Sequence, residues 1–128
     1  MTTVRSAKAK GSAFEYDVQA SLSVLYRDMY RTKERGFQSR VDLVSETFLV
    51  AIECKRWKGI SWNQLKILYD DLDSRFKEYD CFVCFQCNRQ PPLVMFRDRD
   101  GRYFICDFQG LFKVPFIKHE SSRKRGMT

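Results

Sequence analysis

The stretch RVDLVSETFLVAIECKRWKG, from Arg40 to Gly59, contains an apolar segment that charged residues interrupt. Its apolar run FLVAI, Phe48 to Ile52, is typical of a buried β-strand. The strand is expected to continue through Glu53 and Lys55, and Asp42 also lies between apolar neighbours, eleven residues before Glu53. Burying a charge without a partner costs free energy, so charged residues seldom enter such strands. Asp42, Glu53 and Lys55 are therefore candidates for a functional site.

A β-hairpin is expected here, with VDLV and FLVAIECKRW as its strands and SET between them. With Glu46 and Thr47 as the turn residues, Asp42 faces Ala51. Side chains alternate along a strand, so Glu53 becomes a diagonal neighbour of Asp42 on the same face, about 7–8 Å away. A one-residue slip would put the two carboxylates on opposite faces. In the expected register they can converge on one hard cation.

Lys55 is two residues from Glu53 and shares its face of the strand. A Mg²⁺ ion held by few protein oxygens keeps several waters, polarises a phosphoryl oxygen and lowers the pKa of a bound water. A lysine ammonium beside that water can orient the nucleophile or stabilise negative charge in the transition state. The three residues are thus equipped for phosphodiester hydrolysis, and an internal ion-pair cluster is the structural alternative.

The composition indicates a single domain over residues 1–128 with a basic surface. Of these residues, 44% are hydrophobic and 15% aromatic, which is enough to bury a core. The net charge of +7 and the pI of about 9.3 favour a polyanionic partner, nucleic acid before an anionic membrane surface. A basic solvated surface without function is the alternative. Residues 1–10 and 118–128 are expected to be flexible basic ends.

The sequence shows no membrane span and no secretory signal. No stretch reaches the roughly 18 apolar residues of a span, and the N-terminus lacks the apolar segment of a signal peptide. A cytoplasmic protein without a membrane partner is expected, and it would keep its five cysteines reduced.

Apolar periodicity predicts the elements of the N-terminal half. Apolar residues at steps of three and four predict a helix that opens at Gly11-Ser12 and ends near Tyr30. The segment GFQS, residues 36–39, is expected to add at most a short extended piece. After the hairpin, Ser61 and Gln64 match a capping box, which starts a second helix that ends near Lys77.

The C-terminal half is expected to be rich in strands. DCFVCFQC, Asp80 to Cys87, is typical of a buried strand. LVMF and RYFICDF flank the turn dipeptide Asp100-Gly101, so they form an expected hairpin. LFKVPFI, residues 111–117, is a candidate edge strand. The element order predicts an α/β or α+β domain with a mixed sheet.

The motif around Asp42 and Glu53 resembles the PD-(D/E)XK nuclease superfamily. The resemblance rests on Val41-Asp42-Leu43 and Ile52-Glu53-Cys54-Lys55, with ten residues between Asp42 and Glu53. It covers about residues 11–90 and implies an α/β fold with a restriction-endonuclease-like αβββαβ core, in which GFQS would supply the first short strand. The C-terminal hairpin would extend its central mixed sheet. The E-x-K motif alone is weak evidence, whereas the motif with the spaced Asp and a Glu-bearing first helix is fairly strong.

Glu15, in KGSAFEYDV, resembles the helix-one glutamate of the archaeal and viral Holliday junction resolvases. The resemblance implies that Asp42 and Glu53 ligate Mg²⁺, or alternatively Mn²⁺, with the Cys54 backbone carbonyl as a further ligand. Lys55 would be the catalytic lysine. Glu15 would complete the metal site or position the water, and a carboxylate that interacts with the dipole at a helix N-terminus is the alternative.

Gln64 is a further catalytic candidate, because many members of the superfamily carry a glutamine on the helix after E-x-K. Tyr69 follows five residues later, one more than the Q-x-x-x-Y spacing of some exonuclease branches. That spacing argues against those branches. The capping box gives Gln64 an alternative, purely structural role.

Basic residues surround these motifs and would track phosphates without reading the sequence. Trp57 would stack on a base or wedge into a junction, with core or dimer packing as its alternative. The DNA-binding candidates are Arg5, Lys8, Lys10, Arg35, Arg40, Arg56, Trp57 and Lys58, and Arg31 and Lys33 lie in the same basic stretch as Arg35.

Cysteine or histidine sites are the rival centres. Cys81, Cys84 and Cys87 have a spacing that zinc or an iron–sulfur cluster could use. In a strand, however, Cys84 would face away from the other two. His119 is the single histidine and lies in the polar tail, which argues against histidine-based catalysis.

These features predict a metal-dependent, structure-selective DNA endonuclease that resembles a Holliday junction resolvase and acts in recombination or repair. The resemblance implies a homodimer, because two symmetric nicks need two sites, and it suggests an archaeal virus or phage, hence the host cytoplasm. Two alternatives stay open: a restriction or repair nuclease that acts on duplex DNA, and a basic nucleic-acid-binding module without catalysis.

Overall fold

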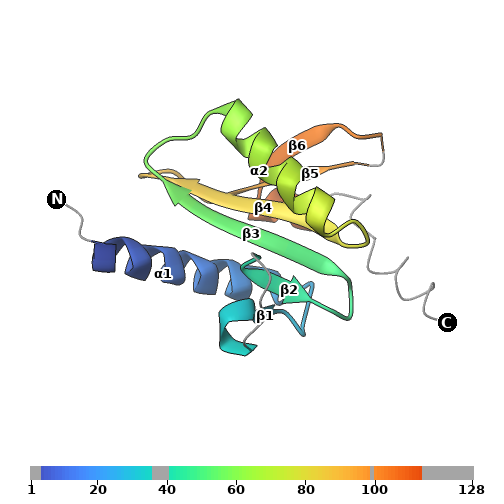
Figure 1. The fold of residues 1–128 in the computed structure, drawn as a ribbon, viewed down its shortest axis with the longest axis horizontal. Helices are drawn as coiled ribbons and strands as arrows, with labels where there is room; N and C mark the ends of the chain where they lie inside the picture. Colours follow the sequence, from blue (N-terminus) through green and yellow to red (C-terminus); the bar gives the residue numbers. More distant parts are fainter. Residues whose placement is uncertain (1–3, 36–40, 99, 114–128) are drawn as a thin grey trace.

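The computed structural model describes the backbone of residues 4–35, 41–98 and 100–113, and the side chains of residues 13–33, 41–98 and 100–110. The described residues form two long helices, six strands, one 3-10 helix and a short C-terminal helix (Figure 1). They are α1 (Val4–Leu22), β1 (Tyr30–Arg31), η1 (Thr32–Arg35), β2 (Leu43–Ser45), β3 (Val50–Trp57), α2 (Trp62–Arg75), β4 (Asp80–Cys87), β5 (Leu93–Arg97), β6 (Tyr103–Asp107) and α3 (Phe108–Lys113).

All six strands form one mixed sheet in the order β1-β2-β3-β4-β5-β6. Only β3 and β4 are parallel, because α2 carries the chain back between them, and every other neighbouring pair is antiparallel. The predicted α/β class with a mixed sheet is confirmed. The elements from α1 to β4 also follow the expected helix, three strands, helix, strand order.

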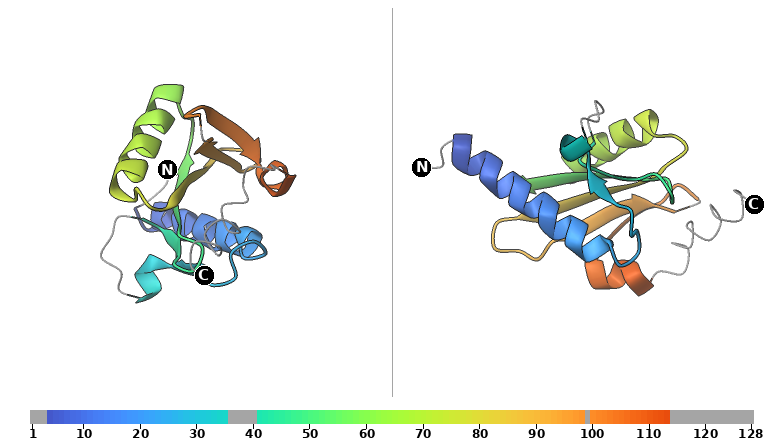
Figure 2. Two further views of the ribbon diagram at one scale, coloured as in Figure 1. Left: turned by 90° about the vertical axis from the view of Figure 1, so that its right-hand side faces the viewer. Right: turned by 90° about the horizontal axis from the view of Figure 1, so that it is seen from below.

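The two long helices cover opposite faces of the sheet (Figures 1 and 2). On the face covered by α1, Arg31 of β1 contacts the helix through Glu15. On the face covered by α2, Arg97 and Tyr103 contact the helix through its aspartates. The strand register places Glu53 and Val83 on this α2 face together with Arg97 and Tyr103.

The first helix differs from the sequence prediction at both ends. It begins at Val4 rather than after Gly11, so residues 4–10 of the expected flexible end are helical. A single internal glycine costs a helix only about 1 kcal/mol, which the buried apolar face can offset. The helix ends at Leu22, and Tyr30 instead lies in β1, where it pairs with Val44 of β2. The first short strand is therefore β1, and the GFQS segment that was expected to supply it lies outside the described residues.

The start of α2 is as predicted. The Ser61 hydroxyl accepts the Gln64 N–H at 3.2 Å, and the Gln64 Oε1 accepts the Ser61 N–H at 2.9 Å, which completes the capping box. Leu65, Tyr69 and Leu72 form the buried stripe of the helix.

The C-terminal hairpin is confirmed, with Gly101 at a φ of +82° in its turn. The prediction of an edge strand is wrong for residues 111–113, which close α3 instead. The Asp107 carboxylate accepts the Gly110 N–H at 2.6 Å and so caps this helix. The rest of the predicted strand, residues 114–117, lies outside the described residues, as does the basic end 118–128.

Candidate active site

The hairpin that carries the site has a wider turn than predicted. Residues 46–49 form the turn, and Leu49 adopts a positive φ of 54°. Asp28, from outside the hairpin, accepts hydrogen bonds from the Ser45 hydroxyl at 2.5 Å and from the Thr47 N–H at 3.0 Å. These contacts hold the turn open, and Ser45 therefore pairs with Val50 rather than with Phe48.

The predicted register was consequently wrong by two residues. Leu43 pairs with Ile52, so Asp42 comes level with Glu53 rather than with Ala51. A shift of two residues keeps every side chain on its face, whereas a shift of one would have reversed them. The expected meeting of Asp42 and Glu53 therefore survives, and the two residues lie closer than the diagonal arrangement implied.

Asp42 is fixed at the edge of β3. It lies in a bend just before β2, its N–H donates to the Ile52 carbonyl at 3.1 Å, and its Oδ2 accepts the Cys54 N–H at 2.7 Å. The carboxylate thus takes the position of a ladder partner for β3 at the residue just before β2 begins. The N–H and C=O of one strand residue point to the same side. The Cys54 carbonyl accordingly faces the edge on which the Asp42 carboxylate lies.

Glu53 is buried beside this carboxylate, with an exposed fraction of 7%. Burial, followed by the charge and the hydrogen bond of Asp42, raises the pKa of Glu53 from 4.5 to about 8, against the lowering effect of Lys55 and Arg75. Glu53 is thus buried directly beside the Asp42 carboxylate, and ionising it there concentrates negative charge in one small region. A divalent cation bound at this place would offset that charge.

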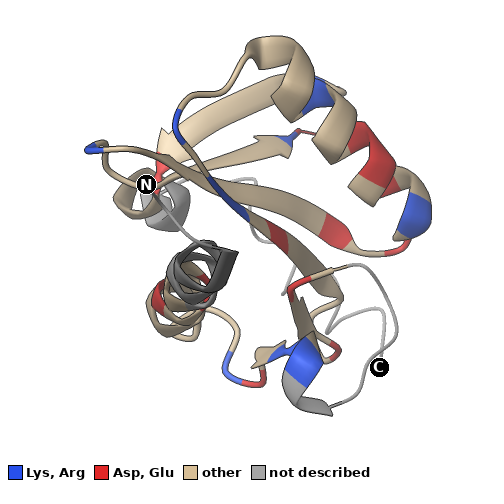
Figure 3. Cartoon of the chain, turned by 60° about the vertical axis from the view of Figure 1, so that its left-hand side comes forward, with Lys and Arg blue, Asp and Glu red and all other residues tan. Residues whose placement is uncertain are grey.

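Lys55 places a cation on the solvent side of the pair. Its Nζ lies 3.9 Å from the Glu53 Oε1, and its side chain is 39% exposed, against 10% for that of Glu53. The site thus combines acidic and basic positions of the same strand, coloured red and blue in Figure 3. The structure brings Asp42, Glu53 and Lys55 together, as the sequence predicted.

Glu15 is engaged elsewhere. Its Oε1 accepts hydrogen bonds from Arg31 at 3.2 and 3.3 Å, and its Oε2 lies 3.5 Å from the Lys33 ammonium. Arg31 also lies over the Tyr16 ring, 4.0 Å from its centroid. Glu15 is in the middle of α1, so the alternative of a dipole interaction at the helix N-terminus is wrong. Arg31 was not predicted as its partner, because the two residues meet only through the tertiary fold.

The Cys54 thiol is affected both by the Asp42–Glu53 pair and by Glu15. Burial and the neighbouring Cys84, then the charges of Asp42, Glu15 and Glu53, raise the pKa of the Cys54 thiol well above 9.0. Glu15 thus acts on the Cys54 thiol, whereas its direct partners are Arg31 and Lys33.

The other candidates are placed as follows. Gln64 is exposed and holds the capping box with Ser61. Trp57 is partly buried and packs against the core, which supports its packing alternative. The side chains of Arg56 and Lys58 are exposed on either side of it. Arg5, Lys8 and Lys10 lie in α1 and Arg35 in η1, all with side chains outside the described part, and Arg40 lies outside it entirely.

The cysteines of β4 are part of the sheet. Cys81 and Cys84 are buried free thiols on opposite faces, and burial raises the pKa of Cys81 to about 12. Among the described residues, no three His, Cys, Asp or Glu side chains converge closely enough to hold a metal ion. His119 lies outside the described part.

A metal ion at the site would therefore have two carboxylates and one backbone carbonyl as its protein ligands. This donor set contains only oxygen and fits Mg²⁺, which usually keeps several waters and binds through one or two carboxylates. It fits a soft metal poorly, because the nearest thiol, Cys54, has a strongly raised pKa.

Comparisons with protein-family models, curated proteins and solved structures found no match. In the described part of the chain, no helix is both long and apolar enough to span a membrane.

Proposed function

We propose that the protein is a metal-dependent DNA endonuclease that hydrolyses phosphodiesters, with branched DNA such as a four-way junction as its substrate. One observation carries the proposal: Asp42 and Glu53 meet at one edge of β3, and the Lys55 ammonium lies 3.9 Å from Glu53. Two carboxylates that can hold a metal ion, with one ammonium beside them, supply the groups that metal-assisted hydrolysis can use.

Asp42, Glu53 and the Cys54 carbonyl would hold Mg²⁺, or alternatively Mn²⁺. The bound ion would supply positive charge at the phosphoryl oxygens and a more acidic water. Asp42 is kept in place by its hydrogen bond to the Cys54 N–H. Lys55 would donate hydrogen bonds to the attacking water or to a non-bridging phosphate oxygen, and so stabilise the charge that develops there. The water oxygen forms a bond to phosphorus and loses a proton to solvent. The bond from phosphorus to the leaving oxygen breaks, and the leaving oxygen keeps the electron pair and takes up a proton from solvent.

DNA as the partner is supported by charge. The net charge is +7, and Lys33, Arg56 and Lys58 are exposed near the elements of the site. Cations of this kind bind phosphates of any sequence. The choice of a junction follows from the resemblance to the resolvases. It would require two copies of the chain, so a homodimer is part of the proposal.

The contacts of Asp42 also favour a second candidate, a binding module without catalysis. The Asp42 carboxylate completes the β-ladder at Cys54, and Lys55 pairs with Glu53, so these charges have partners without any ion. In that case the fold would keep the residues for stability, and the protein would bind nucleic acid without cutting it.

Cleavage of labelled DNA separates these possibilities. A four-way junction, the matched duplex and the single strand are incubated with the protein in Mg²⁺ and in EDTA. We expect paired nicks in the junction and none in EDTA. Cleavage of all three substrates would keep the nuclease and reject the resolvase, and tight binding without cleavage in Mg²⁺ or Mn²⁺ would reject the enzyme.

A further inference from the structure

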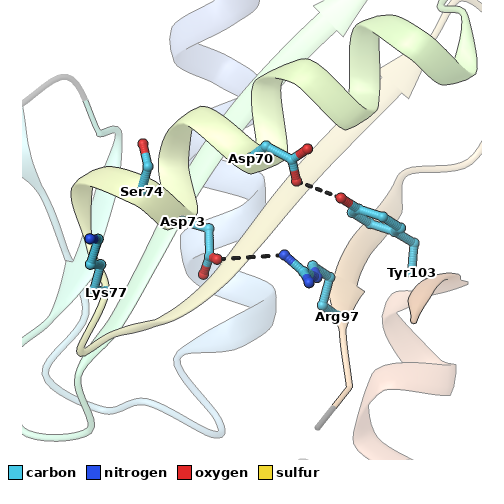
Figure 4. Close-up of a pocket in the computed structure, with 6 residues that line it drawn as sticks. All are labelled: Asp70, Asp73, Ser74, Lys77, Arg97 and Tyr103. Carbon is cyan, nitrogen blue, oxygen red and sulfur yellow. Dashed lines mark hydrogen bonds and ion pairs between the residues drawn. The ribbon is translucent and has the colours of Figure 1, made fainter. Parts of the chain in front are cut away.

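A polar groove lies on the other flank of α2, between this helix and the β5–β6 hairpin (Figure 4). Because β4 lies beneath α2, the pair Asp42–Glu53 is on one side of the helix and this groove is on the other. We call it the α2–β6 groove. Its volume is about 420 Å³, and its lining residues are Asp70, Asp73, Ser74, Lys77, Arg97 and Tyr103.

Tyr103 is the centre of an aromatic cluster at the groove. Its ring makes edge contacts with Trp62 and Tyr69, at centroid distances of 5.6 and 5.9 Å. The Lys66 ammonium and the Arg97 guanidinium lie 5.6 and 5.2 Å from the centroid of the Tyr103 ring. Trp62 is 48% exposed, although it is a large apolar residue. The cluster therefore offers a partly exposed aromatic surface with cations beside it.

The walls of the groove carry both signs of charge. The Tyr103 hydroxyl donates to Asp70, and the Arg97 Nη1 lies 3.7 Å from the Asp73 carboxylate (Figure 4). Lys77 adds a further ammonium at the C-terminal side. A ligand that suits all these groups needs a flat aromatic ring, amino groups that donate to a carboxylate, and negative charge for the cations.

A nucleotide with an unpaired base has this combination. Bases stack on aromatic side chains, exocyclic amino groups donate to Asp carboxylates, and phosphates bind Lys and Arg. The size of the groove is within the range of small-molecule sites. The basic charge of the chain as a whole, +7, favours a nucleic acid over an acidic or neutral peptide.

We propose that the α2–β6 groove binds an unpaired nucleotide of a nucleic acid strand. The base stacks on the Trp62–Tyr103 cluster, its amino group donates to Asp70, and the flanking phosphates contact Lys66, Lys77 and Arg97. Cytosine and adenine carry an exocyclic amino group and thymine carries none, so the groove prefers the first two. The inference rests on the nucleic-acid partner of the proposed function but not on catalysis.

Trp62 itself reports on the binding. The chain has two tryptophans, so Trp57→Phe leaves Trp62 as the single emitter. Short labelled oligonucleotides of cytosine, adenine or thymine are titrated in EDTA, which prevents cleavage, and fluorescence and anisotropy are recorded. We expect the Trp62 emission to be quenched, with tighter binding of the cytosine and adenine strands than of the thymine strand.

Variants of the whole chain, tested by anisotropy with both tryptophans otherwise in place, assign the effect to the groove. Trp62→Ala is expected to weaken binding on the order of tenfold through the lost stacking. Asp70→Asn is expected to reduce the preference for cytosine over thymine. Ile67→Ala is the matched control, because Ile67 is a 71% exposed apolar residue of the same helix but has no aromatic ring on which a base could stack.

Unchanged affinity in Trp62→Ala together with an unchanged preference for cytosine in Asp70→Asn would overturn the inference, as would no binding of any oligonucleotide. Its failure is distinct from that of the proposed function. If the protein cuts DNA but binds oligonucleotides equally well after Trp62→Ala, the nuclease proposal stands and the groove proposal is rejected. If it binds oligonucleotides through Trp62 but never cuts DNA, the groove proposal stands and the nuclease proposal is rejected.

Discussion

The Asp42 carboxylate completes the β-ladder at Cys54, where its Oδ2 accepts the Cys54 N–H at 2.7 Å. This contact gives one side chain two tasks, because it holds the edge of β3 and brings a negative charge to Glu53. Substitutions can separate the two tasks, since asparagine keeps an acceptor oxygen but not the charge.

Asp42→Ala is expected to lower the free energy of unfolding by about 1–2 kcal/mol, because the Cys54 N–H loses its partner. Asp42→Asn should cost less, because its amide oxygen can still accept the bond. Denaturant unfolding of both variants in EDTA measures this difference. Equal losses of stability would show that the charge, and not the hydrogen bond, is what the fold uses.

The stability of the metal-free protein is expected to fall as the pH rises from 4.5 to about 8. The folded state holds the Glu53 proton that the unfolded chain has already released, so folding binds a proton in this range. The protonated Glu53 contributes most to the free energy of unfolding below the unfolded pKa, and this contribution is lost as the pH passes the folded pKa. The total loss is on the order of 2–4 kcal/mol. Unfolding of the wild type across this pH range measures the slope.

Glu53→Gln should flatten this pH profile, while Glu78→Gln, at an exposed glutamate, should leave it unchanged. Mg²⁺ should restore stability above the pKa in the wild type but not in Glu53→Gln. A wild-type profile that stays level through this range would contradict the burial of a protonated Glu53.

Lys55→Met is expected to reduce cleavage on the order of a hundredfold at saturating Mg²⁺, because a cation that stabilises developing charge is lost. DNA affinity should change little, since one exposed cation contributes only a small part of phosphate binding. Single-turnover cleavage and anisotropy separate the two effects. Lys58→Met is the control, an exposed lysine of the same segment, and equal effects of both substitutions would reduce Lys55 to a phosphate contact.

Arg31→Met is expected to destabilise the protein on the order of 3 kcal/mol, because it leaves Glu15 buried with the Lys33 ammonium as its one ion-pair partner among the described residues. The double variant Glu15→Gln with Arg31→Met should recover most of this loss. The contacts favour a structural role for Glu15, so the double variant is expected to keep cleavage. Its loss with the fold intact would instead support the catalytic role that the resolvase resemblance implies.

Much of the fold could be predicted because its signals are local. The Ser61–Gln64 capping box and the Asp100-Gly101 turn each occupy a few neighbouring residues, and each formed the expected element. The FLVAI run formed the expected strand only from Val50 onward, because Phe48 and Leu49 belong to the turn. The meeting of Asp42 and Glu53 was predictable for the same reason, because the alternation of a hairpin is insensitive to an even shift.

The errors arose where distant residues decide the local structure. The wide turn depends on Asp28 contacting Ser45 and Thr47, which nothing in the hairpin sequence reveals. The partnership of Glu15 with Arg31 likewise forms only when α1 packs on the sheet. The start of α3 did have a local signal, the capping Asp107, which the run of apolar residues after it obscured.

The Asp42–Glu53 site is tested most sharply by Mg²⁺-dependent cleavage of a labelled four-way junction by the wild type and by Glu53→Gln, with Glu78→Gln as the matched control. Denaturant unfolding of each variant verifies that it is folded. We expect Glu53→Gln to bind the junction normally and to cut it at least about a hundredfold more slowly, which is the usual effect of removing one group that stabilises charge in a transition state. Cleavage by a folded Glu53→Gln protein at the rate of the wild type would contradict the proposal that the Asp42–Glu53 pair is the active site.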